Sequence, residues 1–167
     1  MNNFNLRINI IRALIEINEN VIFYPKIRRF YKYLKNKNDF NLVFDIGTNK
    51  GQTIKYLKKI NHKIKIFGFE PNKYHFDKLV SKNINNVEMF QLGCSDKEGE
   101  FIFHENILDE SSTFEDVNMN SKWLLKKAEI LGKDKHELIK KSYPVKCIKL
   151  ANFIKENKIK EIDLVKI

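Results

Sequence analysis

The sequence predicts an α/β domain of the doubly wound type, and three observations lead to this class. The short apolar run "LVFDI" at Leu42–Ile46 is typical of a parallel strand that is buried on both faces, and "KIKIFGF" at 63–69 predicts a second strand. Stretches with apolar residues at helical spacing separate these runs. The first run leads into a glycine-containing turn, "GTNKG", and then into a helical pattern. Strands joined by single helices imply right-handed crossovers and therefore a parallel sheet.

The sequence predicts that strands and helices alternate along the first half of the domain. The expected strands and helices alternate in the order 42–46, 51–60, 63–69, 72–82 and 86–92. In the first helix Ile54, Leu57 and Ile60 are expected to face the core. In the second helix the inward residues are expected to be Phe76, Leu79 and Val80.

The second half of the chain departs from this simple alternation. The alternating segment "EFIFHE" predicts an added strand, and a polar loop follows it. The remaining expected elements are a helix at 123–139, a strand at 144–150, a helix at 151–157 and a buried strand in "IDLVKI" at 162–167.

Residues 1–38 form a distinct section, which we predict to be a helical cap on a domain of residues 39–167. The segment "RINIIRALIEI" repeats apolar residues at helical spacing, and "FYPKIRRFYKYLKN" is basic and aromatic. Aromatic side chains at such spacing usually pack in a core, so we expect the cap to rest on the domain. Contact of this section with a membrane surface or a glycolipid remains the alternative.

The composition excludes several classes of function. The chain has 167 residues, the size of about one domain, and carries a net charge of +10. Most of that charge is lysine in a chain rich in asparagine and isoleucine, so we expect no nucleic-acid partner. Cys94 and Cys147 lack metal-ligand spacing, and the four histidines show no pairing pattern, so no metal site is predicted. The sequence shows neither a membrane-spanning run nor a signal-peptide pattern, and a reducing, cytoplasmic setting is expected.

The turn after the first strand predicts a ligand site that does not bind pyrophosphate. Gly47 allows a tight turn and a close approach of a ligand to the backbone, and Gly51 stands where the helix begins. Asn49 occupies the position at which a dinucleotide fingerprint has its second glycine. No Lys-Ser/Thr pair follows the second glycine, so the turn is not a Walker loop either.

Two acids at consecutive strand ends indicate which ligand the turn would hold. Glu70, in "FGFEPN", can accept both hydroxyls of a ribose, and Asp45 suits an ammonium group or an ordered water. Each acid alone has a structural explanation, since Asp45 could form a turn and Glu70-Pro71 could begin a helix. Their joint occurrence favours a nucleoside with an amino-acid tail and no phosphate, which describes S-adenosylmethionine.

These residues resemble the FkbM-type S-adenosylmethionine-dependent methyltransferases. "VFDIGTNKGQT" resembles the first motif of the family, "GFEPN" its acidic second motif, and "NVEMFQLGCSDKEGEFIF" its third-strand segment. "SSTF" and "IDLVKI" are similar to later segments, so the resemblance runs from about residue 41 to residue 167. It implies a Rossmann-like class I methyltransferase fold, a three-layer α/β sandwich.

The resemblance also implies roles for six residues. Asp45, Gly47, Asn49 and Gly51 would form the loop beside the methionine part of S-adenosylmethionine, and Glu70 would bind its ribose. Asp96 would be a partner for the adenine amino group, although Ser-Asp-Lys-Glu-Gly is also an ordinary turn sequence.

The implied activity is methylation of a hydroxyl on a sugar, lipid or secondary metabolite, so the expected partner is a small-molecule or glycan acceptor. In the family, an acidic Asp-x-Glu-Gly segment follows the strand that "DLVKI" resembles, and this sequence ends at Ile167 before it. The resemblance therefore implies a domain that is incomplete at its C-terminus, and the sequence identifies no catalytic base. The alternatives are a noncatalytic remnant and a basic module that binds polyanions or membrane surfaces.

Overall fold

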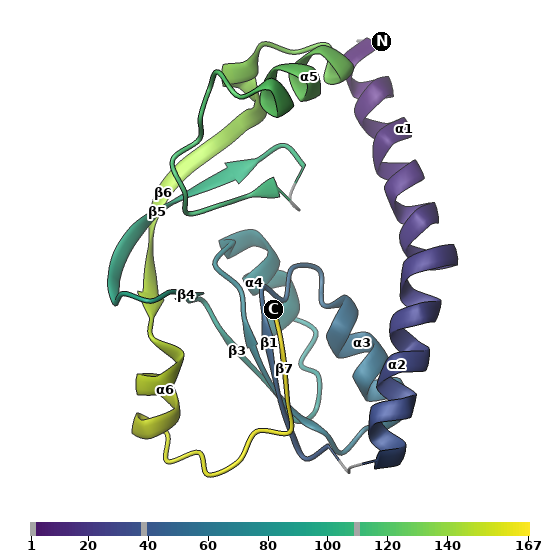
Figure 1. Ribbon diagram of the computed structural model, residues 1–167, viewed down its shortest axis with the longest axis vertical. Helices are drawn as coiled ribbons and strands as arrows, with labels where there is room; N and C mark the ends of the chain where they lie inside the picture. Colours follow the sequence, from purple (N-terminus) through teal and green to yellow (C-terminus); the bar gives the residue numbers. More distant parts are fainter. Residues whose placement is uncertain (1–2, 38–39, 109–110) are drawn as a thin grey trace. The chain divides into compact units, whose positions relative to one another are not determined.

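The structure is a computed structural model that describes residues 3–37, 40–108 and 111–167. The chain divides into two compact units (Figure 1). Unit 1 comprises Met1–Tyr31 and His104–Ser142, and unit 2 comprises Lys32–Phe103 and Tyr143–Ile167. The predicted division between a cap of residues 1–38 and a domain of residues 39–167 stays a prediction.

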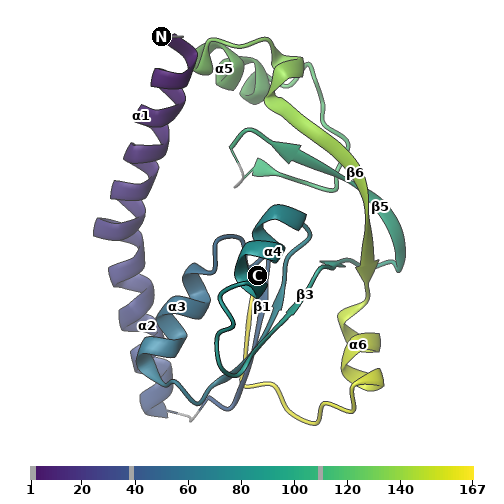
Figure 2. The ribbon, with the colours of Figure 1, turned by 180° about the vertical axis from the view of Figure 1, so that it is seen from behind.

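Unit 2 contains a parallel four-stranded sheet in the order β3-β2-β1-β7 (Figures 1 and 2). The strands of this sheet and the helices of the same unit that follow or precede them are β1 (Leu42–Ile46), α3 (Gln52–Ile60), β2 (Lys65–Phe69), α4 (Lys73–Val80), β3 (Val87–Phe90), α6 (Leu150–Glu156) and β7 (Leu164–Lys166). Helices α3 and α6 lie on opposite sides of the sheet in both views. This arrangement confirms the predicted α/β class. The winding reverses at β1, because β2 and β3 lie to one side of it and β7 to the other.

One face of the sheet is packed with phenylalanine rings. Phe44, Phe67, Phe69 and Phe90 come from β1, β2 and β3, and Phe153 of α6 covers them. The centroid distances from Phe153 to these four rings lie between 5.0 and 6.1 Å, in edge-on arrangements. Such contacts add to the large apolar area that each ring buries. Successive side chains along a strand point to opposite faces of the sheet. Because Phe44 points toward this core, Asp45 lies on the opposite face.

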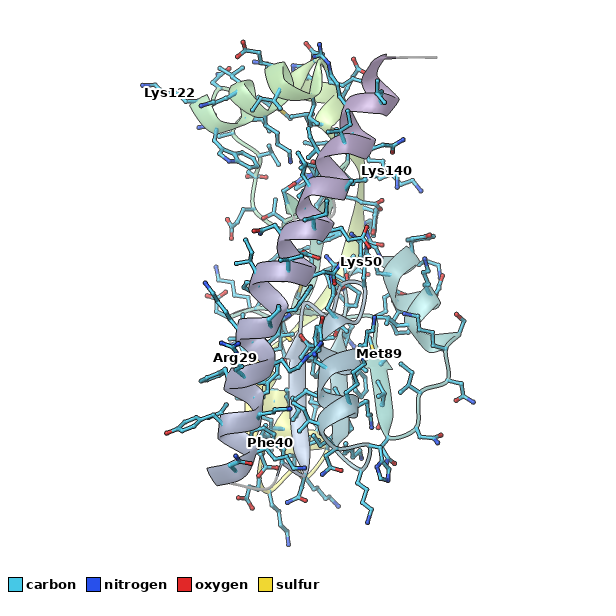
Figure 3. The ribbon with its side chains drawn as sticks, turned by 90° about the vertical axis from the view of Figure 1, so that its right-hand side faces the viewer. Arg29, Phe40, Lys50, Met89, Lys122 and Lys140 are labelled. Carbon is cyan, nitrogen blue, oxygen red and sulfur yellow. The ribbon has the colours of Figure 1, made fainter. Side chains whose placement is uncertain are left out.

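On that opposite face, Gly68 of β2 makes room for its neighbours. A Cβ atom at this position would lie 2.5 Å from the sulfur of Met89 and 2.9 Å from Oγ1 of Thr48. Met89, labelled in Figure 3, is the register partner of Gly68 on β3. Glycine therefore lets the turn after β1 pack closely onto the middle of the sheet.

The register of β7 is fixed by one carboxylate. Oδ2 of Asp163 accepts hydrogen bonds from the backbone amides of Asn41 and Leu42, both at 2.8 Å, and the Asp163 amide donates to the Leu42 carbonyl. These three bonds tie the entry of β7 to the start of β1. As a result Lys166 lies directly opposite Asp45.

Two predicted helices differ from the structure in detail. In α3 Ile54 and Leu57 are buried as expected, whereas Ile60 is half-buried. In α4 Leu79 is buried and Phe76 half-buried, but Val80 is 49% exposed and His75 is buried instead. The inward stripe of α4 therefore runs along positions 75 and 79, four residues apart, and the prediction for Val80 is wrong.

The predicted helix at 123–139 is too long. The helix α5 (Lys122–Leu131) ends at Gly132, whose φ of +65° is the left-handed conformation typical of helix ends. The side chain of Asp134 then caps a short 3-10 helix, η3 (Lys135–Leu138). The strand predicted at 144–150 begins earlier, because β6 spans Ile139–Ile148. This strand lies between β4 (Gly93–Cys94) and β5 (Gly99–Asn106) in a second sheet.

The N-terminal section is one continuous helical run, made of α1 (Asn3–Asn18), the π-helix η1 (Glu19–Phe23) and α2 (Tyr24–Lys37). Tyr31 is buried, but Phe23, Phe30 and Tyr33 are each more than half exposed, so the expected packing is wrong for these three. Among the described residues, no helix has both the length and the apolar character needed to cross a bilayer.

Candidate functional site

The candidate site lies at the carboxyl ends of β1, β2 and β7, where the winding reverses. In open α/β sheets, ligands bind at this kind of switch point. Asp45 of β1 has no exposed surface, and the Lys166 ammonium on β7 lies 3.1 Å from its Oδ1. The same ammonium donates to the backbone carbonyls of Gly47 at 2.9 Å and Ile46 at 3.2 Å. A buried carboxylate, a lysine and two carbonyls thus meet at one corner.

The Asp45 carboxylate is incompletely satisfied. Its contact with Lys166 is an ion pair without hydrogen-bond geometry, and neither carboxylate oxygen accepts a hydrogen bond in the described part of the chain. Burial raises the pKa of Asp45, and the positive charge of Lys166 opposes that rise. Because burying polar atoms without partners is costly, this corner favours an additional donor.

The turn from Gly47 to Gly51 is held by backbone bonds to the sheet. The amides of Gly47 and Thr48 both donate to the Phe69 carbonyl, at 2.9 and 3.1 Å, and Oγ1 of Thr48 donates to the Asp45 carbonyl at 2.9 Å. Gly47, Asn49 and Gly51 all have positive φ, at +69°, +51° and +83°. The turn therefore alternates left-handed residues with bonds that fix it over β1 and β2.

The two glycines of this turn have different surroundings. A Cβ atom on Gly47 would meet nothing within 4 Å, so the backbone there is open to a ligand. A Cβ atom on Gly51 would lie 2.5 Å from a terminal carbon of Leu79, so this glycine permits the start of α3 to approach α4. Lys50, labelled in Figure 3, belongs to this turn and directly precedes Gly51.

Glu70, the residue after β2, clamps two backbone segments. Its Oε2 accepts from the Asn49 amide at 2.5 Å, and its Oε1 accepts from the Asn72 amide at 2.8 Å. The side chain of Asn72 in turn accepts from the His75 amide and begins α4. Burial raises the pKa of Glu70, while the two backbone amides oppose the rise. The acid is therefore held at the edge of the turn, with one backbone amide on each oxygen.

The structure brings together five of the six predicted site residues. Asp45, Gly47, Asn49, Gly51 and Glu70 belong to one connected set of contacts, and the Oδ1 of Asn49 is buried without a hydrogen-bond partner among the described residues. Asp96 is exposed, and its side chain accepts from the Ser95 hydroxyl. No hydrogen bond or ion pair within the described ranges links Asp96 to the turn, so its role beside adenine stays a prediction.

Sequence reasoning missed Lys166 and the second role of Glu70. A lysine inside the apolar run "IDLVKI" is a signal, because a charged side chain in a strand predicted to be buried requires a partner. The prediction of a fully buried strand is itself wrong, since β7 is only partly buried and Val165 is 41% exposed. The identity of that partner follows only from the pairing of β1 with β7.

A parallel sheet whose winding reverses beside a glycine turn, with an acid after the next strand, defines a Rossmann-like α/β fold. Comparison with known families then gives the assignment: the chain belongs to the methyltransferase FkbM domain family, whose model matches residues 45–167. A solved structure described as "StiE O-MT residues 942-1257" is similar, with 15% identity and a TM-score of 0.34. The similarity covers 58% of this chain and 52% of that one, so the chain spans about half of its length. No curated protein matches the chain significantly.

We predict that the burial of Asp45 can be detected as a pH-dependent stability. A carboxyl whose pKa is raised on folding stabilises the protein below its unfolded pKa, and this contribution is lost as the pH rises through the folded pKa. The free energy of unfolding of the wild type relative to Asp45→Asn should therefore fall as the pH rises above the ordinary carboxyl pKa of 3.8. Urea unfolding of both proteins measures this difference. If the stability of the wild type relative to Asp45→Asn instead increased with pH, the ion pair with Lys166 would outweigh the effect of burial on the pKa of Asp45.

We also predict that Glu70→Gln destabilises the fold although it removes a buried charge. The amide side chain has only one acceptor oxygen, so the backbone N–H of either Asn49 or Asn72 loses its partner. An unsatisfied buried donor costs about 1–3 kcal/mol, which chemical denaturation can measure. The matched control is Glu88→Gln, at an exposed position of the edge strand β3, which should change stability little. Equal stability of the two variants would contradict the clamp.

Proposed function

We propose that this chain binds S-adenosylmethionine and acts as an S-adenosylmethionine-dependent O-methyltransferase. The observation that carries the proposal is the pair of buried acids at the switch point, Asp45 and Glu70, joined by an open glycine turn. Membership of the FkbM methyltransferase family supports it. Together they favour a nucleoside cofactor with an amino-acid tail.

The residues at the end of β1 fit the amino-acid part of this cofactor. The buried oxygens of Asp45 and the Oδ1 of Asn49 are acceptors with no hydrogen-bonded donor among the described residues. An α-ammonium group has three N–H donors and could satisfy them. The open side of Gly47 leaves room for the ligand to reach this corner.

Glu70 fits the ribose. An ionised carboxylate offers about four lone-pair positions, and the amides of Asn49 and Asn72 use two of them. The remaining positions can accept the two ribose hydroxyls. The same two amides hold the carboxylate in place, so its orientation does not depend on the ligand.

When bound, S-adenosylmethionine would supply an activated methyl group on a positively charged sulfur. The contribution of this chain is then to bind and orient the ligand, which is the main requirement when the methyl donor is already activated. The resemblance to the family favours a hydroxyl of a sugar, lipid or secondary metabolite as the acceptor. We assign no catalytic base.

The binding prediction is tested by calorimetric titration with S-adenosylhomocysteine and its 2′-deoxyribose analogue. The Glu70→Ala variant should bind S-adenosylhomocysteine at least tenfold more weakly than the wild type, a loss of about 1.4 kcal/mol. The 2′-deoxyribose analogue should bind the wild type more weakly than S-adenosylhomocysteine does. In Glu70→Ala the two ligands should bind almost equally, because the variant and the missing 2′-hydroxyl remove the same interaction.

The control for this titration is Glu88→Ala, which alters an exposed acid on β3 and should bind like the wild type. Circular dichroism of each protein establishes that it is folded. Absence of binding by the folded wild type would contradict the proposal. Binding without methyl transfer to any hydroxyl acceptor would instead favour the noncatalytic alternative.

The exposed aromatic residues of the N-terminal section favour a second candidate function, contact with an anionic membrane surface. Phe23 and Phe30 are each more than half exposed and lie near the basic residues Arg28 and Arg29 in sequence. Aromatic side chains beside basic ones are typical of interfacial helices. Phe23→Ser/Phe30→Ser should reduce cosedimentation with phosphatidylglycerol vesicles. Equal sedimentation of the variant and the wild type would exclude this role for the two rings.

A further inference from the structure

Lys166 occupies a formed binding site for an ammonium group. Its Nζ lies 3.1 Å from Asp45 Oδ1 and donates to the carbonyls of Gly47 at 2.9 Å and Ile46 at 3.2 Å. Three oxygens from β1 and its turn therefore surround this ammonium: two carbonyls accept its hydrogen bonds, and the carboxylate pairs with its charge. The arrangement is what a ligand with a free α-amino group would need at the same corner.

A ligand ammonium and Lys166 cannot both be fully paired with Asp45. Two positive charges on one buried carboxylate repel each other, and the carboxylate neutralises only one of them. The Asp45 side chain is completely buried, whereas that of Lys166 is 30% exposed. Lys166 can therefore turn toward solvent, while Asp45 stays in place.

Without a ligand, Asp45 still needs a positive partner. A buried carboxylate that loses its partner is strongly destabilising. The pairing of β1 with β7, fixed by Asp163, supplies that partner from the opposite strand. Lys166 thus preserves the charge of Asp45 and the shape of the corner until an ammonium arrives.

We propose that Lys166 is an internal stand-in for the α-ammonium of the cofactor, which must displace it in order to bind. Lys166 is then a positioning residue that sets how strongly the site favours amino-acid-bearing nucleosides over nucleosides without that tail. This inference rests on the proposed S-adenosylmethionine function and deepens it.

The test compares two nucleosides that differ at the amino-acid end. S-adenosylhomocysteine carries the α-ammonium, and 5′-methylthioadenosine has the same nucleoside and thioether without it. If Lys166 competes with the ligand, Lys166→Met should bind S-adenosylhomocysteine more tightly while leaving 5′-methylthioadenosine almost unchanged. We expect the ratio of the two dissociation constants to shift about tenfold in favour of S-adenosylhomocysteine, or roughly 1.4 kcal/mol.

Two further variants make the comparison specific. Lys166→Arg keeps a positive charge opposite Asp45 and should give a ratio near that of the wild type. Lys160→Met removes an exposed lysine of the same unit and should also leave the ratio unchanged. A variant that only loosens the fold would weaken both nucleosides together, so the ratio separates competition from a structural effect.

The outcomes separate this inference from the proposed function. If Lys166→Met bound both nucleosides with the same ratio of dissociation constants as the wild type, or with a weaker preference for S-adenosylhomocysteine, only the stand-in role of Lys166 would be overturned. Absence of binding by the folded wild type would overturn the proposed function, and the inference would fall with it.

A measurement on the wild type covers the case in which Lys166→Met does not fold. In protein with 15N-labelled lysine side chains, the Lys166 ammonium signal is assigned by its loss in Lys166→Arg. S-adenosylhomocysteine should move this signal toward that of a solvent-exposed lysine, and 5′-methylthioadenosine should not. The same response to both nucleosides would contradict displacement by the α-ammonium.

Discussion

The buried carboxylate of Asp45 is the constraint on which the rest of the site depends. A charged group without solvent exposure requires compensation from nearby groups, because its hydration has been lost. Lys166 gives that compensation across the β1–β7 pair. The register that places Lys166 there is set by Asp163, which binds two backbone amides at the start of β1. Asp163 at the start of the β1–β7 pair and Asp45 at its end therefore determine the position of Lys166 in the site.

The other part is built on backbone groups. Glu70 joins the turn after β1 to the start of α4 through one amide on each oxygen, and the Phe69 carbonyl receives two amides of the turn. These bonds hold the turn in a conformation with three left-handed residues, which leaves Gly47 open. The phenylalanine core below α6 supports the strands from the other face of the sheet. The site is consequently preorganised, since its polar groups are held by the fold before any ligand binds.

Local sequence patterns predicted much of this arrangement, and long-range pairing accounts for most of what they missed. The strand runs, the glycine turn and the acid after β2 are readable because each depends on residues close in sequence. Lys166 was missed because its partner is 121 positions away and becomes apparent only from the register with β1. The length of α5 was predicted wrongly although Gly132 and Asp134 were visible stop and start signals. The prediction for Val80 fails because the spacing of apolar residues does not determine which of two adjacent faces of the helix packs against the sheet.

The central inference is that the corner between Asp45 and Glu70 receives the amino-acid and ribose parts of S-adenosylmethionine. The most direct measurement is a crystal structure of the chain with S-adenosylhomocysteine bound. We expect the ligand ammonium to lie within hydrogen-bond distance of Asp45 and the ribose hydroxyls to lie within hydrogen-bond distance of Glu70. The Lys166 ammonium should no longer contact Asp45. A ligand bound elsewhere, or one whose ammonium avoids Asp45 while its ribose avoids Glu70, would contradict the claim.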